Sequence, residues 1–198
     1  MFIEPAIIGI LFSWIKKGKM RNIEKINIRN GSLFFIAAII QVFLSLGKAL
    51  NFKFIEYIID NNFFIIYLFT YILLIIGILS NMDKKFMKYI LIGIVLNGLV
   101  IFSNGGKMPV ALGGIPFAND YTEISEREFD IKHESLDENT RLKVLADIIL
   151  IPKPYPLARI ISIGDIFIML GVLIFFPENM IYKSEVKYFS SYLTKNRR

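Results

Sequence analysis

The sequence predicts an all-α integral membrane protein with five transmembrane helices, and three observations lead to this fold class. Of its 198 residues, 55% are hydrophobic and 20% are charged, with a mean hydropathy of +0.54. Soluble domains have about 45–50% apolar and about 25% charged residues. Long apolar stretches recur along the chain, and basic residues gather in three dense groups between them. We therefore expect the apolar stretches to cross a membrane and the basic groups to lie on its cytoplasmic side.

Four apolar stretches approach the length of about 17–25 residues that an α-helix needs to cross a hydrocarbon core about 30 Å thick. A fifth stretch, residues 2–15, is shorter. It crosses as a helix if the neighbouring lysines reach up to the headgroups and the bilayer thins locally. The alternative is a helix that anchors at the interface without crossing. The four longer stretches are residues 33–46, 63–79, 86–102 and 160–176.

The basic residues are distributed unevenly. Of 23 lysines and arginines, six lie in residues 16–31, three in residues 80–88 and five in the tail after Phe176. Cytoplasmic loops are enriched in these residues, and the anionic inner leaflet attracts them. We therefore expect a multi-pass membrane protein with its N-terminus outside and its C-terminus in the cytoplasm. Membrane lipid is an expected partner, whereas nucleic acid is not, because no basic patch alternates with exposed aromatic residues.

This topology divides the chain into four parts. Residues 1–102 form four transmembrane helices with short connections. Residues 103–159 form an ordered extracytoplasmic cap with one short amphipathic helix. The fifth transmembrane helix occupies residues 160–182, and residues 183–198 form a basic cytoplasmic tail.

The composition excludes several kinds of site. The chain has no cysteine and one histidine, so it has no disulfide, no cysteine-ligated metal site, no cysteine nucleophile and no site built from several histidines. We predict neither a metal nor a cofactor. Few ionisable residues lie in the middle of the expected spans, and this argues against an ion-coupled transporter.

Two of the spans carry small residues on one face. Gly93 lies one turn before Asn97 in the fourth span, and Gly164 and Gly171 lie seven residues apart in the fifth. Small residues let helix backbones approach closely in a membrane, and an amide such as Asn97 can bond across the interface. The pattern therefore predicts close helix packing.

The cap opens with a turn signal. Asn104, Gly105 and Gly106 follow the fourth span directly, and asparagine and glycine tolerate the positive φ angles that tight turns require. A plain turn is one interpretation. The other is an anion cradle of consecutive backbone N–H groups, with Lys107 beside it.

The rest of the cap contains the single histidine. We interpret His133 either as a structural hydrogen-bonding residue or as a proton carrier. Ser135 and Glu138 match a capping box, which predicts a short helix from Ser135 to about Ala146. The next acid, Asp147, precedes a strongly apolar run.

Asp165 lies about one turn inside the last apolar run, and two interpretations remain open. In the first, Asp165 is the N-cap of a helix that starts at the next residue. In the second, it is a buried carboxylate that faces the cap and requires a partner. The candidate cationic partners are Lys107, Arg141 and Arg159.

Short motifs in the cap resemble those of a family of small bacterial multi-pass membrane proteins that is catalogued only as a domain of unknown function. The resemblance covers essentially the whole chain. It implies that the motif residues gather on the outer face, and it implies no activity. In two places the chain differs from the family pattern, with Ala146 where glycine is common and Leu150 where proline is common. The motifs are Asn104-Gly105-Gly106-x-Met108-Pro109, His133, Thr140-x-Leu142, Leu145-x-Asp147 and Ser162-x-Gly164-Asp165.

Two functional hypotheses follow. The first is a binding or assembly protein whose cap engages a partner protein, a lipid or a cell-envelope precursor. The second is a small membrane-embedded enzyme at the outer interface, in which Asp147, Asp165 and His133 carry out acid–base chemistry. The candidate binding residues are Asn104, Gly105, Gly106, Lys107, His133, Arg141, Asp147 and Asp165.

Overall fold

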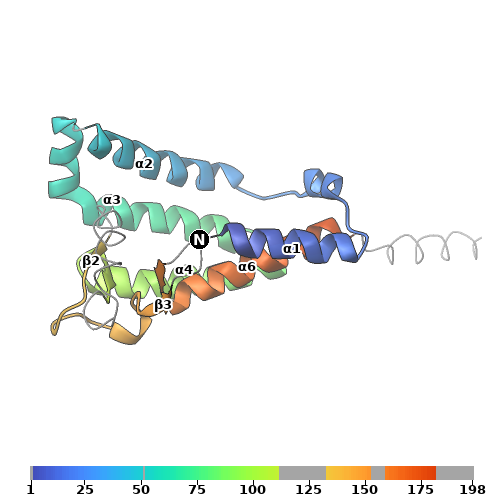
Figure 1. Ribbon diagram of the computed structural model, residues 1–198. Coiled ribbons are helices and arrows are strands. Elements are labelled where there is room, and N and C mark those ends of the chain that lie inside the picture. The colour runs from blue at the N-terminus through green and yellow to red at the C-terminus, as the bar shows by residue number, and fades with distance from the viewer. Residues whose placement is uncertain (1, 51, 112–132, 153–158, 182–198) are drawn as a thin grey trace, which may run out of the picture.

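The computed structural model describes residues 2–50, 52–111, 133–152 and 159–181, which are mostly helical (Figure 1). Within these ranges the α-helices are α1 (Ile3–Ile15), α2 (Gly31–Ala49), α3 (Lys53–Leu79), α4 (Lys85–Ser103) and α6 (Ile163–Met180). The shorter elements are the 3-10 helices η1 (Met20–Lys25) and η2 (Lys143–Leu145) and the strands β1 (Met108–Val110), β2 (His133–Ser135), β3 (Ile149–Ile151) and β4 (Arg159–Ile161).

In the described part of the chain, four helical segments are long and apolar enough to cross a membrane. They coincide with the four longer stretches that the sequence predicts, and they indicate a membrane protein. The remaining helix, α1, is apolar and has 13 residues, so it reaches about 20 Å at about 1.5 Å per residue. The four segments are Gly31–Ala49, Asn61–Leu79, Lys85–Ser103 and Ile163–Met180.

The helices pack side by side along a common direction, except that the first turns of α3 lie across the end of the bundle (Figure 1). Neighbours in the order α2, α3, α4 and α6 run in opposite directions, whereas α1 runs in the same direction as α6. Glu4, near the start of α1, contacts Arg159, which precedes α6. Beyond the far end of α1, the Lys19 N–H donates to the Met180 carbonyl at 3.0 Å. Thus α1 lies along α6 for its full length.

The bundle has two chemically different ends. The basic end contains the turn after α1, the α2 approach, the α3–α4 turn and the end of α6. Several hydrogen bonds join these segments. For example, the backbone N–H of Arg29 donates to Asn81 Oδ1 at 2.9 Å, and that of Lys85 donates to Glu178 Oε1 at 2.9 Å. The opposite end, where α4 ends and α6 begins, carries all the strands in the described part of the chain, and we call it the strand end (Figure 1).

At the strand end, β1 lies between two parallel neighbours. It pairs with β2, with Met108 opposite His133, and Val110 forms a bridge to Asp147. A second, antiparallel pair joins β3 to β4, with Leu150 opposite Ile160. The expected fifth span therefore begins later than residue 160, because residues 159–161 form a strand and the helix begins at Ile163.

The predicted helix from Ser135 to about Ala146 is wrong. Ser135 belongs to β2, and the next N–H, that of Leu136, donates to the Val110 carbonyl at 2.9 Å. The backbone around Ser135 therefore has the extended conformation of the β1–β2 ladder and cannot begin a helix there. Leu142 adopts a left-handed φ of 55°, which a continuous right-handed helix does not allow. Only the three-residue turn η2 remains of the expected helix.

Candidate functional site

The predicted small-residue faces of α4 and α6 pack against each other. A Cβ at Gly93 would collide with the backbone of Gly164 and with Ile168, and one at Gly171 would collide with Ile90 and approach the Phe86 carbonyl. The two backbones are therefore as close as glycine permits, which is the packing that the sequence predicts. This approach brings the polar side chains of the two helices into direct contact.

A buried polar network lies at this contact. Asn97 Nδ2 donates to Asp165 Oδ1 at 2.9 Å, and Ser162 Oγ donates to Asn97 Oδ1 at 2.9 Å. The Ser162 N–H donates to Asp165 Oδ2 at 3.2 Å, and the Asp165 N–H donates to Ser162 Oγ at 2.9 Å. Ser162 is fully buried, and the relative exposure of Asn97 and Asp165 is 9% each. Both carboxylate oxygens of Asp165 therefore hold structural hydrogen bonds.

This network corrects the first interpretation of Asp165 and refines the second. The N-cap of α6 is Ser162, and Asp165 is the third helical residue of a capping box. Its carboxylate is buried, as the second interpretation expects, but the side chain that binds it is the amide of Asn97 rather than a cation.

The three cations proposed as partners of Asp165 lie elsewhere. Arg159 forms an ion pair with Glu4, with Nη1 and Oε1 separated by 2.9 Å and side-chain exposures of 11% and 21%. Arg141 is exposed and contributes its backbone to the cap. Lys107 is also exposed, and its charge acts on the carboxylate of Glu134. The Arg159–Glu4 pair links the start of α1 to β4.

The predicted turn after α4 is confirmed. Gly105 and Gly106 have φ angles of +73° and +97°, which are the positive values that favour glycine. The Gly106 N–H donates to the Ile101 carbonyl at 2.9 Å, and the Lys107 N–H donates to the Asn104 carbonyl at 3.4 Å. Because both N–H groups bond within the turn, this geometry favours the plain turn over the backbone anion cradle.

Asn104 fastens this turn to the distal part of the cap. Its Oδ1 accepts from the Arg141 N–H at 2.8 Å, and its Nδ2 donates to the Arg141 carbonyl at 2.9 Å. The same Nδ2 donates to the Val100 carbonyl at 2.8 Å. Thus a single side chain joins the end of α4 to a segment 37 residues away.

A cavity of about 370 Å³ lies beside the turn. Two lysines from different elements reach it: Lys48 from the last turn of α2 and Lys107 from the cap. The aromatic residues Phe63 and Phe64 of α3 and the turn residue Gly105 also line the cavity. The cavity combines cationic and aromatic surface at the strand end.

His133 and Asp147 flank β1 from opposite sides. The separation of His133 Nε2 and Asp147 Oδ2 is 4.0 Å, which is longer than a hydrogen bond. Asp147 is held by its backbone, because its N–H donates to the Pro109 carbonyl at 3.0 Å and its carbonyl accepts from Ala111 at 2.9 Å. The cap therefore brings His133 and Asp147 together, whereas the side chain of Asp165 is committed to α4 and to its own helix cap.

The chain matches the model of the Family of unknown function (DUF5317) over residues 25–177. It belongs to that family. An uncharacterised protein of Thermotoga maritima is 31% identical over 176 residues, which cover 89% of this chain and 90% of the relative. No solved structure matches the chain.

The matched region includes every strand of the described part of the chain. Asn104, His133, Asp147 and Asp165 all fall within residues 25–177. The short helix α1 precedes this region, although it packs closely on α6.

Sequence reasoning missed two tyrosines near the site. Tyr67 and Tyr71 lie one turn apart on α3, with ring centroids 5.3 Å apart. Both rings lie within electrostatic range of Asp147 and Asp165. The signal in the sequence was a pair of hydroxyl-bearing rings at helical spacing inside an otherwise apolar stretch. Among the described histidine, aspartate and glutamate residues, no group of three is placed to hold a metal ion.

Proposed function

We propose that this protein is a multi-pass membrane binding protein whose strand end, on the extracytoplasmic side, holds an envelope lipid or precursor that carries an anionic group. The observation that carries the proposal is the cavity of about 370 Å³ between Lys48, Lys107 and the rings of Phe63 and Phe64. A ligand of this kind needs a cationic contact for its head and an apolar contact for its body. The cavity offers both at the level where the helices end.

Two features support the proposed orientation. The groups of lysine and arginine before α2 and before α4 lie at one end of the bundle, which the positive-inside rule assigns to the cytoplasm. The parallel course of α1 and α6 fits five crossings with the N-terminus outside, because the first and fifth helices of such a chain run in the same direction. Because the short α1 packs parallel to α6 along its length, it fits a helix that crosses the membrane better than an anchor that lies in the interface.

The cap is suited to binding because it is fastened to the helices. Asn104 bonds to the Arg141 backbone, and the Val110–Asp147 bridge holds the third segment. Segments that are already joined before a ligand arrives lower the entropy cost of ordering a site. Lys107 is therefore held at a fixed place on the rim, where it can face Lys48 across the cavity.

The ligand proposal is tested by titrating the purified chain in mild detergent with dihexanoyl phosphatidic acid. Dihexanoyl phosphatidylcholine serves as the zwitterionic comparison. We expect saturable binding of the phosphatidic acid, weakened about tenfold by Lys48→Gln and by Lys107→Gln, since one charge-assisted contact contributes about 1.5 kcal/mol. Lys53→Gln is the matched control, because this exposed lysine at the same end does not line the cavity. Equal weakening by all three variants, or no preference for the phosphatidic acid, would reject the proposal.

The orientation is tested separately with a reporter that is active only outside the cytoplasm. We expect activity when it is fused after Ala111 and none when it is fused after Arg198. The opposite pattern would place the strand end in the cytoplasm.

A second candidate, a membrane-embedded enzyme, rests on the approach of His133 to Asp147 within 4.0 Å. Under this alternative, His133→Gln and Asp147→Asn abolish rescue of a deletion strain at unchanged protein abundance, whereas Lys48→Gln does not. Under the binding proposal, Lys48→Gln is the variant that fails to rescue. The third residue of that hypothesis, Asp165, forms hydrogen bonds with Asn97 and Ser162.

A further inference from the structure

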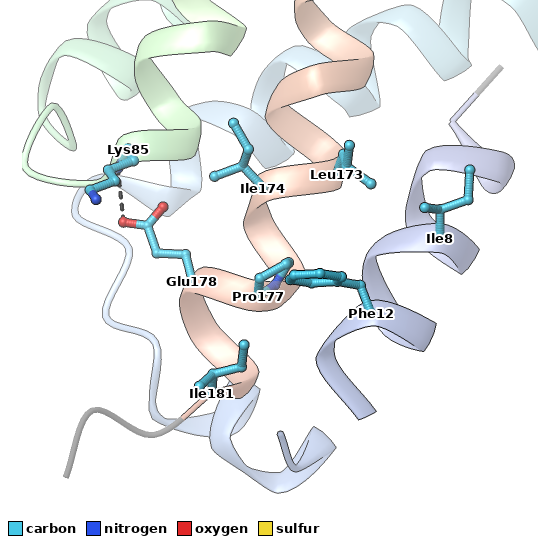
Figure 2. Close-up of a pocket in the computed structure, with 8 residues that line it drawn as sticks. All are labelled: Ile8, Phe12, Lys85, Leu173, Ile174, Pro177, Glu178 and Ile181. Carbon is cyan, nitrogen blue, oxygen red and sulfur yellow. Dashed lines mark hydrogen bonds between the residues drawn. The ribbon is translucent and has the colours of Figure 1, made fainter. Parts of the chain in front are cut away.

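A groove of about 590 Å³ lies between α1 and α6 at the basic end of the bundle (Figure 2). Ile8 and Phe12 of α1 form one wall, and Leu173, Ile174 and Pro177 of α6 form the other. Ile181 closes the groove beyond the end of α6. All six of these residues are apolar, and the groove lies against a helix that is long and apolar enough to span a membrane.

Two close helix contacts hold the groove open between them. At Gly9 the backbone of α1 lies so near Leu173 and Phe176 that a Cβ would collide with the Leu173 carbonyl oxygen. Pro177 lies four residues after Leu173 and has no N–H to donate to the Leu173 carbonyl. The backbone of α1 at Gly9 lies against this carbonyl instead. At the far end, Gly18 lies against Met180. The groove is therefore a fixed feature of how α1 and α6 pack.

The carboxylate at the rim of the groove is already occupied. Glu178 Oε1 accepts from the Lys85 N–H at 2.9 Å, and Oε2 accepts from the Phe86 N–H at 3.0 Å. Glu178 thus caps α4 from a distance, and the positive end of the α4 dipole offsets its charge. The N-cap residue of α4, Lys84, makes no such side-chain bond.

Two lysines lie near the groove, one on each side of it. Lys85 lines the groove, and Lys16 Nζ is 6.0 Å from the centroid of the Phe12 ring that forms its wall. In the described part of the chain, neither ammonium lies within ion-pair distance of a carboxylate. The groove therefore has an apolar interior, and its rim carries two lysines and one hydrogen-bonded carboxylate, Glu178, which leaves a net positive formal charge.

We propose that this groove binds one anionic phospholipid of the bilayer, with an acyl chain between α1 and α6 and the phosphate at Lys85 and Lys16. Sites of about 300–1,000 Å³ hold small ligands, and basic pockets between membrane helices bind anionic headgroups. The cationic rim selects an anionic headgroup, and the apolar walls of the groove match an acyl chain. This inference concerns the opposite end of the bundle from the proposed strand-end ligand and does not depend on it.

The test is native mass spectrometry of the full chain. The protein is first equilibrated with vesicles of equal parts phosphatidylglycerol and phosphatidylcholine and then transferred to mild detergent. We expect one retained phosphatidylglycerol per chain and a clear preference over phosphatidylcholine. Ile8→Trp fills the groove and should reduce retention at least tenfold. Ile7→Trp is the matched control, because Ile7 is similarly exposed on α1 but does not line the groove.

A second pair of variants tests the headgroup without altering the packing. Lys85→Gln removes one of the two positive charges but keeps the backbone N–H that donates to Glu178. It should remove most of the preference for phosphatidylglycerol, whereas Lys88→Gln, an exposed lysine of the same helix outside the groove, should preserve it. Equal retention in Ile7→Trp and Ile8→Trp overturns the proposed site. Unchanged headgroup preference in Lys85→Gln overturns the proposed role of the rim.

Discussion

Two asparagines, one at each end of the bundle, make the same three hydrogen bonds. Asn81 follows α3 at the basic end, and Asn104 follows α4 at the strand end. Each Nδ2 donates to the carbonyl four residues earlier and also to the carbonyl of a distant arginine, and each Oδ1 accepts the N–H of that arginine. The arginines are Arg29 for Asn81 and Arg141 for Asn104. In both cases one amide ends a helix and captures the backbone of another segment.

The two amides differ in burial. Asn81 is fully buried, whereas Asn104 is partly exposed and its bonds to Arg141 are open to water. A buried group that loses its partner costs about 1–3 kcal/mol, whereas an exposed one can bond to water instead. The comparison teaches that the same connection can be rigid at one end and more readily opened at the other. The end that we propose as the ligand site carries the weaker connection.

The largest effect is expected for Asn81→Ala. The substitution leaves the N–H and carbonyl of Arg29 and the carbonyl of Gly77 without their partner. We expect a loss of about 3 kcal/mol, which corresponds to a decrease in Tm of about 6–12 °C. Thermal unfolding in mild detergent measures this shift. A decrease in Tm smaller than that of the Asn104 variant would contradict the conclusion that the buried connection contributes more to stability.

Asn104→Ala should have a smaller effect. Water can replace part of the bonding to Arg141, so we expect a loss of about 1 kcal/mol and a Tm lower by about 2–4 °C. The cap should nevertheless loosen, and protease should cleave near Arg141 faster than in the unmodified chain. Unchanged cleavage would show that the strand ladder alone holds this segment.

Much of the helical frame was predictable because its signals are local. Apolar length located α4 and α6, and the spacing of Gly93, Gly164 and Gly171 identified the faces that meet. The turn at Gly105 and Gly106 followed from backbone chemistry. Each of these inferences depends on residues within one or two helical turns.

The errors concern partners that are distant in sequence. Asn97 and Asp165 are 68 residues apart, and Glu4 and Arg159 are 155 apart. Charge alone suggested a cation for Asp165, but close helix packing places the Asn97 amide there instead. Ser135 and Glu138 match a helix-capping pattern, but hydrogen bonding of this segment to β1 holds it in a strand instead. No local pattern distinguishes these outcomes.

Small effects are expected for Arg29→Ala and Arg141→Ala, although both arginines take part in the two connections. Their backbones make the essential bonds, and any residue other than proline supplies them. Among the described residues, the Arg29 side chain makes an exposed ion pair with Asp83 at 3.6 Å and a long bond to the Ser80 carbonyl at 3.4 Å. We expect changes below about 1 kcal/mol in the same unfolding assay. A loss equal to that of the asparagine variants would show that the side chains matter.

The smallest effect concerns the turn after β2. The Thr140 hydroxyl donates to Asp137 Oδ1 at 2.8 Å, and this bond holds the pKa of that carboxyl below its usual value. Because the folded-state pKa is lowered, the ionised carboxylate stabilises the fold above its unfolded pKa. That contribution disappears as pH falls through the folded value. Thr140→Val should raise the pKa of Asp137, which the pH dependence of its carboxyl carbon chemical shift would measure. An unchanged titration would show that another contact dominates.

The pairing of α1 with α6 has a consequence for biosynthesis. Among the described helices, α1 finds its main packing surface on α6, which is synthesised later, and the Glu4–Arg159 ion pair forms only after Arg159 has been made. A hydrophobic segment of 13 residues is poorly held in lipid on its own, since a stable crossing takes about 20. The packing of α1 is therefore completed only after α6 has been translated. In a chain truncated before α6, α1 has no α6 surface to pack against.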